Sequence, residues 1–290
     1  MEQDRTISEP KEATAKRNAK DSVFTDLFAY SNYRFQLFRF LHPEAIDISE
    51  NDIRLITLKP IILNLPYNDL GLLVKDRLMI FVEAQSRWSI NILTRILLYL
   101  AMTWKDYIEE NQLDIYGTRE IDMPKPEFYV ICTEKRTFPK DVFSLRDELW
   151  DDPDVPVDLK VKVVYSENKD DIVCQYIIFC RVLDEQEKLF GRNERAVEET
   201  IRICMDQNIL KDYLETRRKE VVSIMKALFD QETAVENYAK EREKKGAVNM
   251  CQRMGATIDT AIDYIVDEFN ISREQASKVV KAYWKKPTAV

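Results

Sequence analysis

The chain has very little glycine. Five of its 290 residues are glycine, and the closest two, Gly246 and Gly255, lie nine positions apart. A P-loop and a dinucleotide-binding fingerprint each need several glycines in one short loop, so neither motif can be present. Collagen-like and glycine-rich linker architectures are excluded for the same reason. We therefore expect no nucleotide cofactor.

Histidine is scarcer still, because His42 is the only one in the chain. A single histidine excludes a zinc site built from several histidines. Its position between Leu41 and Pro43 argues against a Ser-His-Asp triad. A hydrolase with this composition would draw its acid–base chemistry from carboxylates, lysines or a metal-bound water.

Paired cysteines and export signals are also missing. The five cysteines are odd in number and form no CxxC pair, which indicates small buried residues in a reducing compartment. The first residues are polar and charged, without the apolar stretch of a signal peptide. Residues 90–104, the most apolar run, are too few to span a bilayer and include Arg95. We expect a cytoplasmic protein with no membrane segment.

What the chain does have is a mixture of apolar and charged residues with a surplus of acid. Hydrophobic residues make up 45% and charged residues 32%, which is typical of a folded globular protein. The formal net charge is −8 and the isoelectric point is about 5.1. This balance argues weakly against a general polyanion binder, but it does not exclude one local basic face.

The hydrophobic pattern predicts an α/β core followed by helices. We expect a flexible tail at 1–19, the core at 20–168, a helical extension at 169–246 and a helical hairpin at 247–290. Helices are predicted within 22–42, at 89–110 with Ser89 as its N-cap, and at 171–190, 194–212, 215–229, 231–245, 257–269 and 272–284. Strands are predicted at 54–63, 69–74, 78–85, 127–133 and 159–165, with a loop over 134–157.

The strands 69–74 and 78–85 flank a short charged turn and predict a β-hairpin. If the turn is centred on Asp76, antiparallel pairing places Asp69 directly opposite Glu83. Because side chains alternate along a strand, Glu83 and Gln85 share one face. Opposite positions on one face have Cβ atoms ~4.5–5.5 Å apart. Asp69, Glu83 and Gln85 are therefore expected to converge.

Two carboxylates held this close repel each other unless one takes a proton or a cation lies between them. Mg²⁺, with Mn²⁺ as a substitute, suits carboxylate oxygens and retains waters, one of which can act as a nucleophile. Gln85 could orient that water or a phosphate oxygen. The alternative is structural: Asp69 closes a turn, and Glu83 pairs with an arginine.

A longer motif surrounds these residues. It comprises Asn68-Asp69-Leu70-Gly71, the hairpin, Phe81-Val82-Glu83-Ala84-Gln85-Ser86, and a helix that carries Arg95-Ile-Leu-Leu-Tyr99. This arrangement resembles the PD-(D/E)XK nuclease superfamily, and in particular the Rpn-like recombination-promoting nucleases, also described as putative transposases. The resemblance covers residues 20–245. It implies a restriction-endonuclease-like core with a mixed central sheet and Mg²⁺-dependent cleavage of DNA.

The resemblance also assigns roles to single residues. Asp69 matches the aspartate of the motif and Glu83 its second acidic residue, so both would be metal ligands. Gln85 stands where the superfamily usually has lysine, although the Rpn-like branch is known for glutamine there. Loss of the lysine removes a charge that would stabilise the transition state, so activity would be weak or would rely on Arg87 or Arg95. Asp21 is either an outer metal ligand or a plain helix N-cap.

Arg95 and Tyr99 lie four residues apart and share one face of their helix. In an otherwise apolar helix, one possibility is that they point at the active-site carboxylates or at a phosphate. The alternative is structural: Arg95 forms a salt bridge with Glu83 or Asp69 that only stabilises the core. As catalytic residues they would act with Asp69, Glu83 and Gln85.

Three basic residues are candidate DNA contacts. Lys75, Arg77 and Arg87 are expected near the carboxylates and could bind phosphates, although such residues are usually solvated. The terminal helices 257–269 and 272–284 could form a helix-turn-helix, but a plain helical hairpin is the simpler interpretation.

The leading expectation is a cytoplasmic Mg²⁺-dependent DNA endonuclease. The resemblance to the Rpn-like nucleases implies a bacterial protein linked to recombination, mobile elements or phage defence. The substitution of Gln85 and the acidic total leave an alternative: a catalytically weak or inactive nuclease fold that binds DNA or a protein partner. Hydrolysis of another phosphate ester is a third possibility. Cleavage of both DNA strands needs two sites, so a homodimer is expected in that case.

Overall fold

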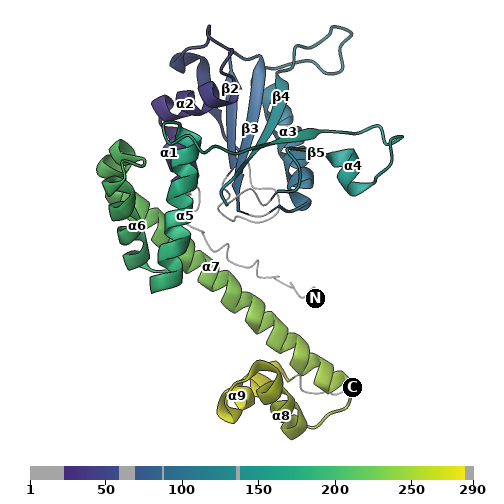
Figure 1. Cartoon of the computed structure of the whole chain (residues 1–290). Helices are drawn as coiled ribbons and strands as arrows, with labels where there is room; N and C mark the ends of the chain where they lie inside the picture. The colour runs from purple at the N-terminus through teal and green to yellow at the C-terminus, as the bar shows by residue number, and fades with distance from the viewer. Residues whose placement is uncertain (1–22, 59–68, 87, 135–137, 285–290) are drawn as a thin grey trace, which may run out of the picture. The chain divides into compact units, whose positions relative to one another are not determined.

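The structure, a computed structural model, describes residues 23–58, 69–86, 88–134 and 138–284 (Figure 1). The chain divides into two compact units, Met1–Leu228 and Phe229–Val290, which we call unit 1 and unit 2. Helix α7 (Lys211–Arg253) contributes residues to both units. Each unit has its own apolar core.

Unit 1 is built on a six-stranded mixed sheet with the order β1-β2-β3-β4-β6-β5. The strands are β1 (Ile53–Ile56), β2 (Asp69–Val74), β3 (Leu78–Gln85), β4 (Lys125–Cys132), β5 (Val142–Ser144) and β6 (Lys160–Val164). Strands β1, β2 and β3 form an antiparallel meander, β3, β4 and β6 run parallel, and β5 is an antiparallel edge strand. The predicted α/β class is confirmed.

The hairpin β2–β3 has the predicted register, with Asp69 opposite Glu83 and Val74 opposite Leu78. Its turn bends at Lys75 and Asp76, which both have positive φ angles. The Asp76 carboxylate accepts a hydrogen bond from Arg54 at 2.8 Å. Both strands are buried along most of their length, as a central position in the sheet requires.

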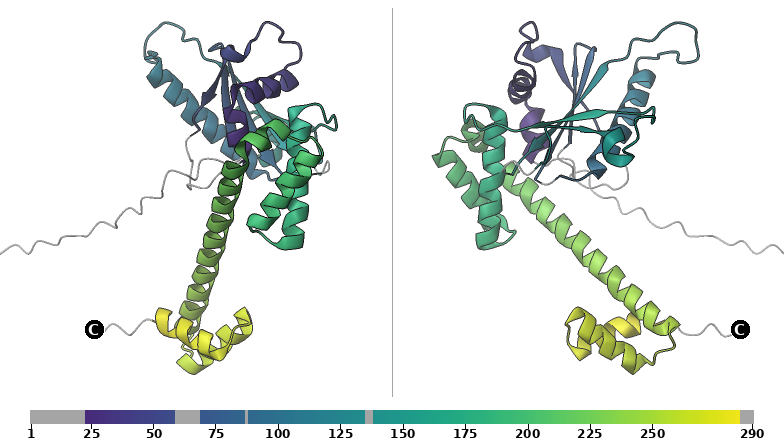
Figure 2. Two further views of the ribbon diagram at one scale, coloured as in Figure 1. Left: turned by 90° about the vertical axis from the view of Figure 1, so that its left-hand side faces the viewer. Right: turned by 45° about the vertical axis from the view of Figure 1, so that its right-hand side comes forward.

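Helices cover both faces of the sheet (Figures 1 and 2). Helix α3 (Asn91–Glu110) packs on one face through a core that includes Phe81, Ile92 and Ile96. Helices α1 (Val23–Ala29), α2 (Ser31–Leu41) and α5 (Ile172–Phe190) lie on the other face. The predicted helix 89–110 is present, but Ser89 is not its N-cap: no side chain caps it, and the Ser89 carbonyl accepts the Ile92 amide at 3.0 Å.

Two further expectations were wrong. Residues 134–157 are not one loop, because β5 and the short helix α4 (Leu145–Leu149) lie within it. The helices predicted at 215–229 and 231–245 are one helix, α7, whose backbone leaves helical angles only at Arg217. No proline interrupts this polar stretch, so the helix continues.

The remaining helices of unit 1 are α6 (Glu194–Asp206), which packs against α5, and the first part of α7. Asp26 on α1 ties these to the core, because it accepts hydrogen bonds from Tyr213 and Arg217, both at 2.8 Å. In the described part of the chain, no helix combines the length and hydrophobicity needed to cross a membrane.

Unit 2 contains the end of α7 with α8 (Ile258–Phe269) and α9 (Arg273–Tyr283). The two short helices pack together with Val248 and Cys251 of α7 around a small core. The capping box predicted between Ser272 and Gln275 is present. The terminal pair therefore folds as helices, as expected.

Candidate functional site

The β2–β3 hairpin carries the predicted acidic pair on the face that α3 covers. Asp69 and Glu83 are register partners. Alternation along β3 places Gln85 on the same face as Glu83, together with Phe81, which belongs to the core shared with α3. The predicted convergence of the two carboxylates is confirmed.

Helix α3 brings two more side chains to this pair. The Arg95 guanidinium donates a hydrogen bond to Glu83 Oε1, and the Tyr99 hydroxyl donates to Asp69 Oδ2 at 2.5 Å. Arg95 and Tyr99 are one helical turn apart, so each faces one carboxylate. The predicted salt bridge from Arg95 to Glu83 is present, and it also places a cation beside the acidic pair.

Burial dominates the electrostatics of the pair. The Glu83 residue is only 5% exposed. Burial, together with the nearby Asp69 carboxylate, raises the pKa of Glu83 to about 8 despite the opposing effect of Arg95. Burial also raises the pKa of Asp69, against the hydrogen bond from Tyr99 and the charge of Arg95. Without a further cation, the pair therefore holds a proton near neutral pH.

Three buried side-chain oxygens at this site accept no hydrogen bond from the surrounding described residues: Asp69 Oδ1, Glu83 Oε2 and Gln85 Oε1. A proton held between Asp69 and Glu83 satisfies the carboxylate pair when no cation is present, and a cation would take the place of that proton. All three are oxygen ligands of the kind that Mg²⁺ prefers. The residues present therefore fit a divalent cation.

The donor set is small. Among the described residues, no group of three or more histidine, cysteine, aspartate or glutamate side chains could hold a metal. The site offers two carboxylates and one amide. A cavity of about 10 Å³ adjoins Asp69, Glu83 and Tyr99, which is about the volume that one water needs.

Not all the predicted site residues gather here. Asp21 and Arg87 lie outside the described residues. Lys75 and Arg77 are at the turn, the opposite end of the hairpin from Asp69, a strand length of roughly 20 Å. The expectation that they lie near the carboxylates is wrong, because the turn and the acidic pair are at opposite ends of β2 and β3. Lys75 instead donates to the Asp47 carbonyl at 3.0 Å.

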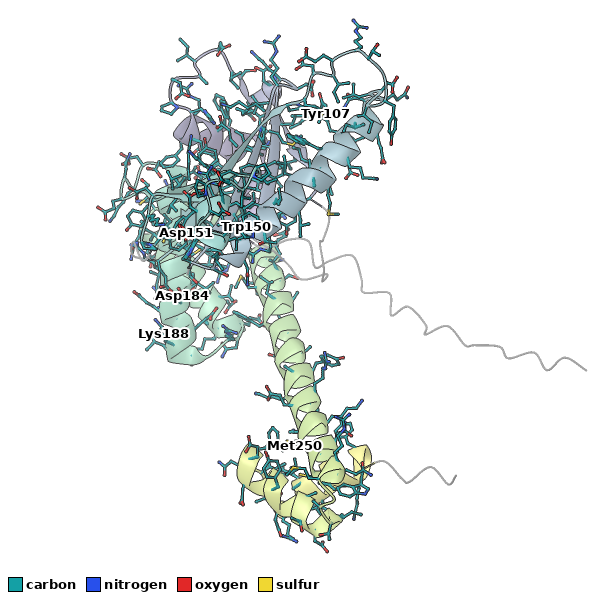
Figure 3. The ribbon with its side chains drawn as sticks, turned by 90° about the vertical axis from the view of Figure 1, so that its right-hand side faces the viewer. Tyr107, Trp150, Asp151, Asp184, Lys188 and Met250 are labelled. Atoms are coloured by element: carbon teal, nitrogen blue, oxygen red, sulfur yellow. The ribbon has the colours of Figure 1, made fainter. Side chains whose placement is uncertain are left out.

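Among the described residues, two larger cavities border the sheet, and neither was predicted. One of about 210 Å³ adjoins Cys132, Lys140 and Tyr165. It lies one strand from the site, because Cys132 pairs with Gln85. The other, of about 360 Å³, lies between β1 and the C-terminal half of α3 and includes Tyr107 (Figure 3). Finding either would have required the strand order, which no local sequence pattern contains.

Comparisons with protein-family models, with curated proteins and with solved structures found no match.

Proposed function

We propose that the chain is a Mg²⁺-dependent DNA endonuclease of the PD-(D/E)XK type, in its Rpn-like branch. The observation that carries this proposal is the convergence of three buried side-chain oxygens, on Asp69, Glu83 and Gln85, next to Arg95 and Tyr99. The element order gives further support, because a helical start, a three-stranded meander, a helix and further strands are what the sequence resemblance implies.

In this proposal Asp69 and Glu83 hold the metal, and Gln85 adds a neutral oxygen. The bound ion would polarise a phosphoryl oxygen and lower the pKa of a water. Tyr99 fixes the rotamer of Asp69 through its hydrogen bond, so that the other carboxylate oxygen stays free for the metal. Arg95 offsets the charge of Glu83 and supplies the positive charge that Gln85, in place of lysine, does not provide.

A nicking assay tests this function. Purified protein is expected to nick supercoiled plasmid with Mg²⁺ or Mn²⁺ and to lose this activity in EDTA. Asp69→Asn and Glu83→Gln, which keep side-chain size, are expected to abolish it. The matched control is Asp76→Asn, an exposed acid at the far end of the same hairpin, which should cleave normally. Nicking that continues in EDTA, or in both site variants, would refute the proposal.

The second candidate is a nuclease-fold protein that binds DNA or a protein without cleaving. The Arg95–Glu83 salt bridge favours it, since it partly offsets the charge of one carboxylate without a metal. Calorimetric titration separates the two candidates. Binding of Mn²⁺ that disappears in Glu83→Gln supports the nuclease, whereas no binding at millimolar metal, with retained DNA or protein binding, supports the alternative.

A further inference from the structure

The acid surplus of the chain is concentrated at one edge of the sheet. Residues 141–158, which contain β5, α4 and the loop that follows, hold seven acidic residues and one arginine. Their net charge is −6, against −8 for all 290 residues. The rest of the chain is therefore close to neutral.

The same segment exposes large apolar side chains. Val142 is 48% exposed, Leu149 37%, Trp150 49% and Val157 48%. Tryptophan is among the residues most enriched at binding hot spots. Figure 3 faces this edge and labels Trp150 beside Asp151. We call these four side chains and the acidic residues of 141–158 the Trp150 face.

Local contacts link the parts of the segment that carries the Trp150 face. Lys140 pairs with Glu148 at 2.5 Å and so joins the start of β5 to the end of α4. The Asp158 carboxylate accepts from Ser144 Oγ at 2.8 Å, and the Leu145 amide donates to the Leu159 carbonyl at 2.9 Å. Helix α4 and the end of the segment are thereby tied to β5 and to the residues beside it.

The face lies at an open edge of the sheet. Strand β5 pairs with β6 and is last in the strand order of the described residues. The Asp141 carbonyl accepts a hydrogen bond from the Val163 amide at 2.8 Å. The backbone N–H and C=O groups of the odd-numbered residues of β5 therefore point toward β6. The backbone of Val142 consequently points away from β6, toward the open edge. An extended peptide could lie along this edge.

We propose that the Trp150 face binds a lysine- or arginine-rich segment of another protein, with an apolar side chain of that segment seated on Trp150. The charge selects the partner: acidic side chains attract a basic peptide and repel nucleic acid and anionic membranes. The apolar side chains supply the contact area that a merely solvated acidic surface lacks. This inference does not depend on the proposed nuclease function.

Binding of a fluorescein-labelled peptide of four Lys-Val repeats, followed by anisotropy with the full-length protein at about 150 mM salt, tests the proposal. A peptide of four Glu-Val repeats tests the contribution of charge, and a peptide of four Lys-Gly repeats tests the contribution of the apolar side chains. We expect the Lys-Val peptide to bind more tightly than both. Trp150→Ala is expected to weaken it about tenfold or more.

Two triple variants with the same change in charge complete the test. Asp151→Asn, Asp152→Asn and Asp154→Asn together should weaken binding and reduce its dependence on salt. Asp259→Asn, Asp267→Asn and Glu268→Gln, on exposed positions of α8, should leave it unchanged. The proposal is overturned if the Lys-Val peptide does not bind, if Trp150→Ala binds it equally, or if both triple variants weaken it to the same extent. Plasmid nicking by Trp150→Ala is expected to equal that of the wild type, whatever the peptide result.

Discussion

The β2–β3 hairpin and the Trp150 face are both acidic, but they use their carboxylates in opposite ways. At the hairpin, two carboxylates are buried, each bonded to a side chain of α3, and burial raises the pKa of both. At the Trp150 face, Asp151, Asp152 and Asp154 are exposed and remain in water. The two regions differ in solvation. Removal of water makes the charged form of a carboxylate unfavourable and shifts its pKa, and groups with shifted pKa values are often the ones used in catalysis.

The largest expected difference between the two regions is in catalysis. Glu83→Gln is expected to lower Mg²⁺-dependent nicking by a factor on the order of 10³ or more, because it removes a proposed metal ligand. Asp151→Asn is expected to leave the rate unchanged. Initial rates of plasmid nicking measure both. Equal rates for Glu83→Gln and Asp151→Asn would show that the buried pair is not the catalytic centre.

The next difference is in stability. Arg95→Ala leaves Glu83 buried without its cation, and we expect a loss of roughly 1–3 kcal/mol, less than for a fully buried pair because the arginine is partly exposed and Glu83 can take a proton. The matched control is Arg146→Ala, which breaks the more exposed pair with Asp147 and is expected to cost about 0–1 kcal/mol. Urea unfolding in EDTA measures both values, and equal losses would contradict the comparison.

The dependence of stability on pH follows from the pKa of Glu83. This group has a pKa of about 8 in the folded protein, against a model value of 4.5. The folded state therefore binds its proton more tightly than the unfolded chain, and stability falls as pH rises between these values. In EDTA, the wild type is expected to lose more thermal stability from pH 5 to pH 9 than Glu83→Gln does. Identical slopes would refute the raised pKa.

The affinity for metal should change with pH in the opposite direction to the stability of the metal-free protein. Because Mg²⁺ requires the ionised carboxylates, its affinity is expected to rise with pH up to about 8, with protons released on binding. Calorimetry in two buffers of different ionisation enthalpy measures the protons released. Release of no protons near pH 7 would contradict the protonated state of the pair.

The smallest effect is expected from Tyr99→Phe. This change removes one hydroxyl, and with it the hydrogen bond to Asp69. We expect a loss of about 1 kcal/mol in stability. Nicking should fall by less than in Glu83→Gln, because Asp69 remains but is less well oriented. The control is Tyr107→Phe, on the same helix at the other cavity, which should nick at the wild-type rate.

Much of the hairpin was predictable because its determinants are local. Two apolar strands around a short charged turn fix the register, and alternation then fixes the face of Glu83 and Gln85. The same register separates Lys75 and Arg77 from the carboxylates by the length of the hairpin, so the prediction that they lie near the site was wrong. The contacts of Arg95 and Tyr99 followed from their spacing only as alternatives, since the partner depends on how α3 packs.

The Trp150 face was not predicted, and the reason is physical. Strand β5 and helix α4 are too short to show a hydrophobic period, and prolines 153 and 156 gave the segment the composition of a loop. The strand order that puts β5 at the edge depends on pairings between distant segments. The continuity of α7 was missed for a different reason: its polar middle has no apolar face on which to judge helix length.

The Arg95–Glu83 salt bridge has a consequence for how the protein would be loaded with metal. The Arg95 guanidinium on α3 partly offsets the charge of the buried Glu83 carboxylate on β3, so the site contains a compensating group when no ion is bound. An arriving metal would then compete with Arg95 and a proton for the same carboxylate. Under the proposed function, the metal-free enzyme would be folded but inactive. The concentration of free divalent ion would then set the fraction of molecules that can cleave DNA.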